Sequence, residues 1–322
     1  MTAATHAPTT VDTRPGDLLL IANPAAGAYS AELIDRVTES LSAGDRRVRT
    51  VHTCAAGDAA EAAARAVGPG RPDVVVVIGG DGTVAEVCGA LADVPVGPAV
   101  LILPGGSGNS TARNVWGDRT IDQILDAVAD GAFRTRRLDL LRLVEPDVTV
   151  PLGVSTGFLA QVLIAARAVD PAVRGIDRYF AAAGSVIAAM PTHPTRVSVD
   201  GAVVFEGDAC SVTVGGGRYR ARRFAFLPHS VLDDGLLDVS VIGALTATQT
   251  QQLLPLVMTG QHLSQPGVSY HRGSTVVIER LDGRPLVAEY DGTVWDAAGT
   301  TITTQIRPQS ISVIAPPTPP CG

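Results

Sequence analysis

The sequence predicts two domains, a doubly wound α/β domain followed by an antiparallel β-sandwich domain. The chain has 322 residues, more than one typical domain, and 46% of them are hydrophobic, which is enough for a sizeable core. Apolar runs alternate with helical patterns as far as residue 131, as expected for parallel strands joined by helices. Beyond residue 191, short strand patterns separated by Gly, Asp and Pro follow one another, which is typical of a sandwich.

The first half contains four expected strands and four expected helices. The run DVVVVIGG is apolar at consecutive positions, as in a central parallel strand that is buried on both faces. The helix that follows it carries one apolar stripe of Val84, Val87, Cys88 and Leu91. The expected strands are 17–23, 47–53, 73–80 and 98–106, and the other expected helices are 31–41, 57–67 and 120–131.

The second half begins with two alanine-rich helical segments, 155–169 and 176–190, before its strands. Several of those strands alternate apolar and polar residues with a period of two. The expected strands are 195–201, 209–216, 236–242, 274–280, 285–292, 300–306 and 310–316. The expected organisation is a disordered segment at 1–16, the α/β domain at 17–137, the β-sandwich domain at 138–306, a strand at 307–316 that returns to the first domain, and a disordered tail at 317–322.

Charge and composition exclude some classes of function. The net charge of −7 argues against nucleic-acid binding, which needs a basic surface. The chain has no lysine, so a mechanism that requires one is excluded. The four cysteines show no metal-binding spacing, and the first 16 residues do not form a signal peptide. No apolar run reaches the roughly 18 residues that span a bilayer. We therefore expect a cytoplasmic protein that binds, at most, to the inner face of the membrane.

Three glycine-bearing loops are expected at the carboxyl ends of strands, where doubly wound sheets bind ligands. They are NPAAG (23–27), GGDGT (79–83) and PGGSGNS (104–110). Glycine lets backbone N–H groups approach an anion closely, and a helix that begins beside Thr83 adds its N-terminal dipole. The loops favour phosphate binding. The alternative is that tight strand–helix turns use glycine for their geometry alone.

The glycine loops do not match the common phosphate-binding motifs. A P-loop requires lysine, the motifs of protein kinases are missing, and GGDGTVAE places a carboxylate inside the loop, unlike a dinucleotide fingerprint. A carboxylate would repel phosphates unless a cation lies between them or the carboxylate accepts a proton from an attacking hydroxyl. Asp81 therefore indicates Mg²⁺-dependent phosphoryl transfer.

Five motifs run in order through nearly the whole chain, NPAAG, GGDGTVAEV, LPGGSGNSTAR, GGGRYRARRFAFLPHSVLDDGLLDVSVI and EYDGT. Together they resemble the diacylglycerol kinase family, which also includes sphingosine kinases and bacterial lipid kinases. GGDG alone also occurs in NAD kinases and phosphofructokinases. DDGLLDV after a β-rich passage narrows the match to the lipid kinases.

The resemblance implies that ATP binds in a cleft between the two domains, which would hold the active site. The residues implied to contact the nucleotide are Gly79, Gly80, Asp81, Gly82, Thr83, Val84 and Ala85, with Asn23, Thr53 and Ser107 at the other walls. Ser107 stands where the family more often has threonine, and Ser110 replaces a common aspartate. Arg113, just after the third loop, is a further candidate for a phosphate contact.

Two Mg²⁺ ions are implied by the same resemblance. A structural Mg²⁺ would bind the loop VLDDGLL through the carbonyls of Val231 and Leu236 and the carboxylate of Asp234. Asp81 would reach a catalytic Mg²⁺ or act as the base.

The family motif DGE near the end of the chain reads Asp291-Gly292-Thr293 here. Threonine cannot act as a base at neutral pH, so we assign the general-base role to Asp291. The alternative is that Asp291-Gly292 is merely a hairpin turn. Glu289 is expected to point to the opposite face of the strand.

The remaining basic and apolar segments have two interpretations each. Arg218, Arg220 and Arg222 could meet lipid headgroups or ATP phosphates, or they could lie on a solvated strand edge. The helical segments 155–169 and 176–190 could line an acyl-chain pocket, or they could form ordinary core.

The function that the sequence predicts best is an ATP- and Mg²⁺-dependent kinase whose acceptor is a hydroxyl of a lipid or lipid-like alcohol. Two alternatives stay open, a kinase of NAD, a soluble polyol or a specialised metabolite, and a catalytically silent nucleotide- or lipid-binding protein. Expected partners are the lipid, the membrane surface and, through an exposed sandwich edge, a second copy of the chain.

Overall fold

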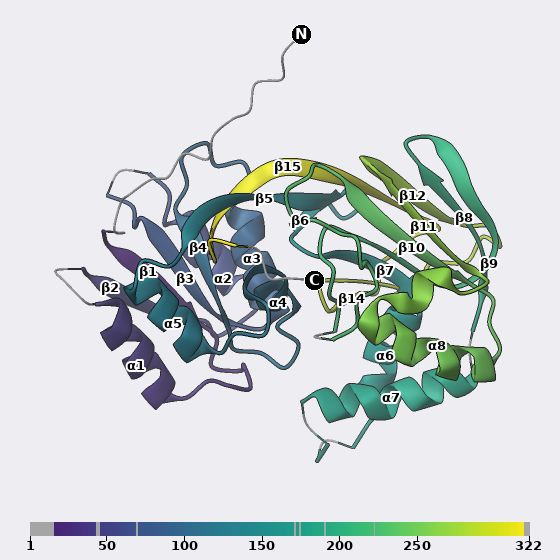
Figure 1. Ribbon diagram of the computed structural model, residues 1–322, viewed down its shortest axis with the longest axis horizontal. Coiled ribbons are helices and arrows are strands. Elements are labelled where there is room, and N and C mark those ends of the chain that lie inside the picture. Colours follow the sequence, from purple (N-terminus) through teal and green to yellow (C-terminus); the bar gives the residue numbers. More distant parts are fainter. Residues whose placement is uncertain are drawn as a thin grey trace, which may run out of the picture.

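The computed structural model describes residues 16–42, 46–68, 70–170, 172–173, 175–189, 191–221 and 223–318. It confirms the expected fold class, because an α/β unit and a sandwich-like β unit lie side by side (Figure 1). The segments expected to be disordered fall outside the described residues, apart from Gly16, Pro317 and Thr318. Arg222 also lies outside them.

The α/β unit is built on four parallel strands in the order β2-β1-β3-β4. Every residue of β1 and β3 is buried, as their uninterrupted apolar runs predict. The strands are β1 (Leu18–Ala22), β2 (Val48–His52), β3 (Val74–Gly79) and β4 (Ala99–Pro104), and the helices are α1 (Ala31–Leu41), α2 (Asp58–Ala64), α3 (Asp81–Leu91), α4 (Ser110–Trp116) and α5 (Ile121–Ala129). The short helix α4 is absent from the sequence-based expectation.

The second unit is an antiparallel β assembly with helices α6, α7 and α8 gathered on one side of it (Figure 1). Its elements are β5 (Arg134–Leu143), β6 (Val148–Val150), β7 (Gly153–Gly157), α6 (Phe158–Ala166), α7 (Ile176–Ala189), β8 (His193–Val199), β9 (Ala202–Gly215), β10 (Leu237–Gly243), α8 (Ala247–Thr259), the 3-10 helix η1 (Gln261–Ser264), β11 (Val268–Gly273), β12 (Thr275–Arg280), β13 (Ala288–Tyr290), β14 (Thr293–Trp295) and β15 (Thr301–Ala315). Helix α8, which begins at a capping box of Thr246 and Gln249, is also absent from the expectation.

Strand β15 connects the two units. The sequence predicts two strands, 300–306 and 310–316, but the structure has one strand with a bulge between Arg307 and Ile311, opposite β5. Near its start β15 pairs with β12, and near its end Val313 pairs in parallel with Val100 of β4. β5 and β15 therefore run from one unit into the other, as the arch across the top of Figure 1 shows.

Each unit has its own apolar core. One cluster fills the α/β unit and a second lies inside the β unit. Two smaller clusters lie beneath the helices, one between α8 and the strands and one between α6 and α7. Among the described residues, no helix is both long enough and apolar enough to cross a membrane.

Candidate active site

The second and third glycine loops pack against each other through their backbones. A Cβ atom on Gly106 would lie 2.4 Å from the Cα of Gly80, and one on Gly105 would lie 2.8 Å from the backbone nitrogen of Gly79. A side chain at these positions would therefore push the loops apart. Asn109 closes the third loop, since its Oδ1 accepts a 2.7 Å hydrogen bond from the N–H of Gly106.

The first loop joins the same corner through Asn23. Its Nδ2 donates a 2.9 Å hydrogen bond to Oγ1 of Thr83, and its Oδ1 accepts one from the N–H of Ala25. Thr83 in turn packs on Gly79, where a Cβ would lie 2.6 Å from the Cβ of Thr83. The three loops that the sequence places at strand ends thus meet at one edge of the sheet.

A cavity of about 960 Å³, which we call the loop cavity, opens over these three loops. Six residues predicted to bind nucleotide line it, Asn23, Thr53, Gly80, Gly82, Thr83 and Ser107. Gly79, Val84 and Ala85 do not line it, and Val84 is only 2% exposed in the core. The far wall comes from the second unit and includes Arg178 and Tyr179 at the start of α7.

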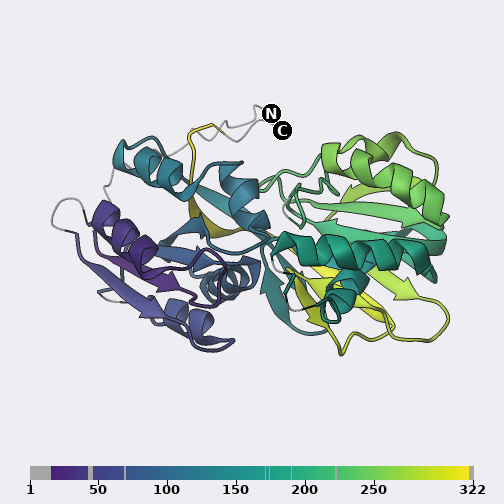
Figure 2. The same ribbon diagram turned by 90° about the horizontal axis from the view of Figure 1, so that it is seen from below.

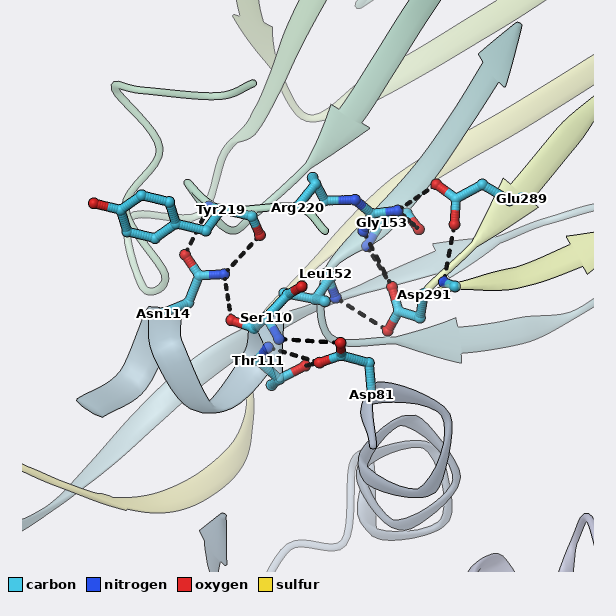
Figure 3. Close-up of polar contacts among 11 residues, drawn as sticks. Asp81, Ser110, Thr111, Asn114, Leu152, Gly153, Tyr219, Arg220, Glu289 and Asp291 are labelled. Atoms are coloured by element: carbon cyan, nitrogen blue, oxygen red, sulfur yellow. Dashed lines mark hydrogen bonds and ion pairs between the residues drawn. The ribbon is translucent and has the colours of Figure 1, made fainter. Parts of the chain in front are cut away.

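Asp81 is the first residue of α3 and faces the first turn of α4 (Figure 3). Its carboxylate accepts hydrogen bonds from the N–H groups of Ser110 (3.0 Å) and Thr111 (2.8 Å) and from Oγ1 of Thr111 (3.1 Å). An ionised carboxylate has about four lone-pair sites, so one remains for a further ligand. Helix α4, which the sequence did not reveal, is therefore what orients Asp81.

Asp81 lines a second cavity of about 240 Å³, the carboxylate cavity, together with Asp291. Asp291 and Gly292 form the two-residue turn between β13 and β14, with φ values of 45° and 82°. Asp291 is nevertheless 2% exposed, and its carboxylate accepts hydrogen bonds from the N–H groups of Gly153 (2.8 Å) and Leu152 (3.3 Å). It is thus a hairpin-turn residue whose side chain is fixed inside a cavity.

Arg220 joins Asp291 to Glu289 (Figure 3). Its guanidinium lies 2.6 Å from Oε1 of Glu289 and 3.4 Å from Oδ1 of Asp291. The expectation that Glu289 points away from Asp291 is wrong, because residues two apart in a strand share a face. The interpretation of Arg220 as a solvated or headgroup-facing residue is also wrong, since it is only 3% exposed.

The environment of Asp291 raises the pKa of its carboxyl to about 7. Burial is the main cause, and the nearby carboxylates of Glu289 and Asp81 act in the same direction. Arg220 and the Gly153 N–H oppose the shift but do not cancel it. A carboxyl with a pKa near 7 can both accept and release a proton at neutral pH.

Arg113 does not line either cavity. Its guanidinium lies 4.1 Å from the ring centroid of Tyr219 and 3.1 Å from Asp118. Next to it, the side chain of Asn114 bonds both the N–H and the carbonyl of Tyr219 at 3.0 Å. Helix α4 is therefore attached to the second unit at this point, and the role of Arg113 in nucleotide binding stays a prediction.

In the loop predicted to hold a structural Mg²⁺, both aspartates already form ion pairs with arginines. Asp234 accepts a 3.1 Å hydrogen bond from the N–H of Leu236 and forms an ion pair with Arg272, while Asp233 pairs with Arg136. In the described part of the chain, no three His, Cys, Asp or Glu side chains group as metal ligands. A cation on Asp234 would have to displace Arg272, so the donor set does not fit Mg²⁺ as the loop stands.

Comparison with known proteins agrees with the fold. Residues 17–143 match the diacylglycerol kinase catalytic domain, and residues 153–315 match the YegS C-terminal NAD kinase beta sandwich-like domain. A diacylglycerol kinase of Mycobacterium tuberculosis (strain CDC 1551 / Oshkosh) is 29% identical over 237 residues, which are 70% of this chain and 72% of that protein. One of Staphylococcus aureus (strain bovine RF122 / ET3-1) is 25% identical over 264 residues, 81% of this chain and 82% of that protein.

A solved structure of a diacylglycerol kinase from Bacillus anthracis str. Sterne has the same fold. Its TM-score is 0.71 at 20% identity, over 95% of this chain and 98% of that chain.

The matched catalytic domain and the two relatives indicate a phosphotransferase of the kinase class. The chain belongs to the diacylglycerol kinase family, since the two matched domains together cover most of its length. The resemblance seen in the motifs is thereby confirmed.

Four residues of the site were missed or misread from the sequence. They are Asn114, Arg178, Tyr179 and Arg220. The only available signal was the run of alternating arginines at 218–222, which does not reveal which of them is buried.

Proposed function

We propose that the protein transfers the γ-phosphate of ATP to a hydroxyl group of a lipid. The observation that carries this proposal is the position of Asp291 in a cavity shared by a glycine loop and apolar side chains. Gly80 and Ser107 line both the loop cavity and the carboxylate cavity, while Leu159 and Val162 line the latter opposite them. A phosphate and an apolar alcohol can therefore meet beside one carboxylate.

The loop cavity is assigned to ATP. Its volume of about 960 Å³ lies in the range of about 300–1,000 Å³ that small-molecule sites occupy. The N–H groups of the glycine loops and the first turn of α3 offer donors to the phosphates. Thr53 and Asn23 supply polar contacts at the other wall.

Asp81 is the residue that would hold a nucleotide-bound Mg²⁺, through the lone-pair site that Ser110 and Thr111 leave open. Mg²⁺ would there neutralise the charge of the phosphates during transfer. No step is assigned to a metal on the loop that contains Asp234.

Asp291 is the proposed general base. Its carboxylate takes the proton of the acceptor hydroxyl, the hydroxyl oxygen forms a bond to the γ-phosphorus, and the bond from that phosphorus to the bridging oxygen of ADP breaks. ADP and the phosphorylated alcohol leave, and Asp291 releases its proton to water. Because the N–H groups of Leu152 and Gly153 fix the carboxylate, most of the catalytic gain comes from positioning.

The acceptor is proposed to be a lipid alcohol of the diacylglycerol type, as named for the relatives. A third cavity, the apolar cavity, shares Leu159, Val162, Tyr179 and Ala221 with the carboxylate cavity and continues between α6, α7 and α8. Its lining is almost wholly apolar, which suits an acyl chain better than a soluble polyol, but its volume of about 40 Å³ would have to widen between the helices to admit the chain. On the same helices, Ile164, Phe180 and Met258 are 38–45% exposed, which favours contact with a membrane surface.

The proposal is tested by incubating the protein with γ-labelled ATP, Mg²⁺ and mixed micelles of a crude lipid extract, with Asp291→Asn in parallel. Label in a lipid spot that disappears in the variant is the expected result, and the spot identifies the acceptor. Label found only in the aqueous phase would show that the acceptor is a soluble molecule and not a lipid. ATP binding without phosphate transfer would show that the protein is catalytically inactive.

A further inference from the structure

The loop cavity requires a positive charge that the glycine loops do not provide. ATP carries about four negative charges, of which Mg²⁺ compensates two. Among the described residues, the walls of the cavity contain one acidic side chain, Glu86, and one basic side chain, Arg178. Asp81 adds a further negative charge at the adjoining carboxylate cavity.

The other described arginines near the site are engaged elsewhere, while Arg174, between the wall residues Val173 and Gly175, lies outside the described residues. Arg220 lines only the carboxylate cavity and is held by Glu289 and Asp291. Arg113 and Arg218 lie over the ring of Tyr219, at 4.1 Å and 5.5 Å from its centroid, and line neither cavity.

Arg178 lies in the first turn of α7, whose N-terminal end is directed toward the α/β unit (Figure 2). Its Nη2 donates a 3.3 Å hydrogen bond to the carbonyl of Val169 just beyond α6, which holds the guanidinium in place. Its Nε is buried and finds no acceptor among the described residues. Because the Nε atoms of Arg134 and Arg218 are also buried without an acceptor among the described residues, the evidence for a ligand is the position of Arg178 in the wall of the loop cavity.

The position of the next residue, Tyr179, indicates which part of the nucleotide would lie beside the guanidinium of Arg178. Tyr179 lines the loop cavity, the carboxylate cavity and the apolar cavity, so the first turn of α7 stands at their junction. The terminal phosphates must lie at that junction for transfer to an acceptor beside Asp291. A guanidinium there can bind phosphate oxygens through two parallel N–H donors.

We propose that Arg178 binds the β- and γ-phosphates of ATP and thereby joins α7 of the second unit to the glycine loops of the first. The inference rests on the proposed nucleotide site. It assigns to this arginine the phosphate-binding role that a lysine fulfils in other kinases.

The test is to measure dissociation constants of ATP, ADP and AMP by calorimetry, with Mg²⁺, for the wild-type full-length protein and for Arg178→Gln. Charged hydrogen bonds of this type correspond to about 10- to 100-fold in affinity. We expect that loss for ATP, a smaller loss for ADP and no change for AMP. Arg178→Lys should recover part of the ATP affinity, because it restores the charge without the two-pronged geometry.

Arg167→Gln is the matched control, because Arg167 is 60% exposed, ends the neighbouring helix and lies 3.9 Å from Asp296. It should bind ATP like the wild type. Equal ATP affinity in Arg178→Gln, or an equal loss for all three nucleotides, would overturn the inference. Circular dichroism of each variant checks that the fold is retained. Absence of phosphate transfer by the wild type would instead contradict the proposed function, so the two failures are distinguishable.

Discussion

Arg220 and Glu289 form an ion pair of 2.6 Å in which both side chains are less than 5% exposed. Such a pair is costly to bury, and breaking it on one side is costlier still, because the remaining charge stays buried without compensation. Arg220 also faces Asp291, so its removal would leave three carboxylates, those of Asp81, Glu289 and Asp291, in one cavity. The pair therefore links the stability of the second unit to the state of the proposed base.

Replacing Arg220 by methionine should reduce the free energy of unfolding by about 3–5 kcal/mol, the usual cost of removing one partner of a buried ion pair. The measurement is urea denaturation at pH 7. Adding Glu289→Gln to Arg220→Met should restore part of the stability, since it removes one of the unpaired charges. Unchanged stability of the single variant would show that the pair is open to solvent.

The rate of transfer should rise with pH through about 7 and then level off. Asp291 acts as a base only when it is deprotonated, and burial raises its pKa to about 7. The check is kcat/KM between pH 5.5 and 9. Asp291→Asn should lose transfer at every pH while still binding ATP. A profile that is flat down to pH 5 would argue against Asp291 as the base.

Gly106→Ala should weaken nucleotide binding and lower stability by about 1–3 kcal/mol, the range typical of overpacking. The new Cβ would lie 2.4 Å from the Cα of Gly80. Because the contact is with backbone and not with a flexible side chain, the two loops would have to shift apart. The control is Gly184→Ala in α7, where a Cβ would have nothing within 4 Å. That variant should gain about 0.5–1 kcal/mol from better helix propensity. Similar behaviour of the two variants would contradict the loop packing.

Chelation of divalent cations should leave the Tm of the wild-type protein unchanged in the absence of nucleotide. Asp234 already pairs with Arg272, which it shares with the buried Asp238, so we expect the loop to keep its structure without Mg²⁺. In Arg272→Gln the carboxylate is released, and the Tm should then rise with added Mg²⁺. If EDTA lowers the Tm of the wild type, and Asp234→Asn removes that effect, the loop binds a metal and Arg272 moves aside.

The α/β unit was predictable because its signals are local. Three apolar runs and one alternating segment, 47–53, each followed along the chain by a helical pattern, give strands and helices directly. Helices α4 and α8 were not predicted, because α4 is only seven residues long and α8 carries Pro255 in its interior. The bulge that makes β15 continuous depends on its pairing with β5, which is more than 150 residues away.

The site was predictable where one residue type carries the chemistry. Asp81 could be chosen because a carboxylate inside a phosphate-binding glycine loop needs a chemical reason, and Asp291 because it matches the aspartate of the family motif DGE. The partners of those carboxylates come from distant segments. Arg220 is 71 residues from Asp291 in the sequence, and only the pairing of β13 with β7 and of β7 with β9 brings their segments together. Burial and pKa are properties of that assembly, so no local pattern encodes them.

Strand β15 also has a consequence for how the protein is made on the ribosome. The strand that pairs with β4 and β5 contains residues 301–315, whereas the other strands of the α/β unit end at residue 104. During synthesis the first unit therefore exposes the open edge of β4 until almost 200 further residues have emerged. The late arrival of β15 closes that edge and fixes both units in one step, so the cleft between them forms last.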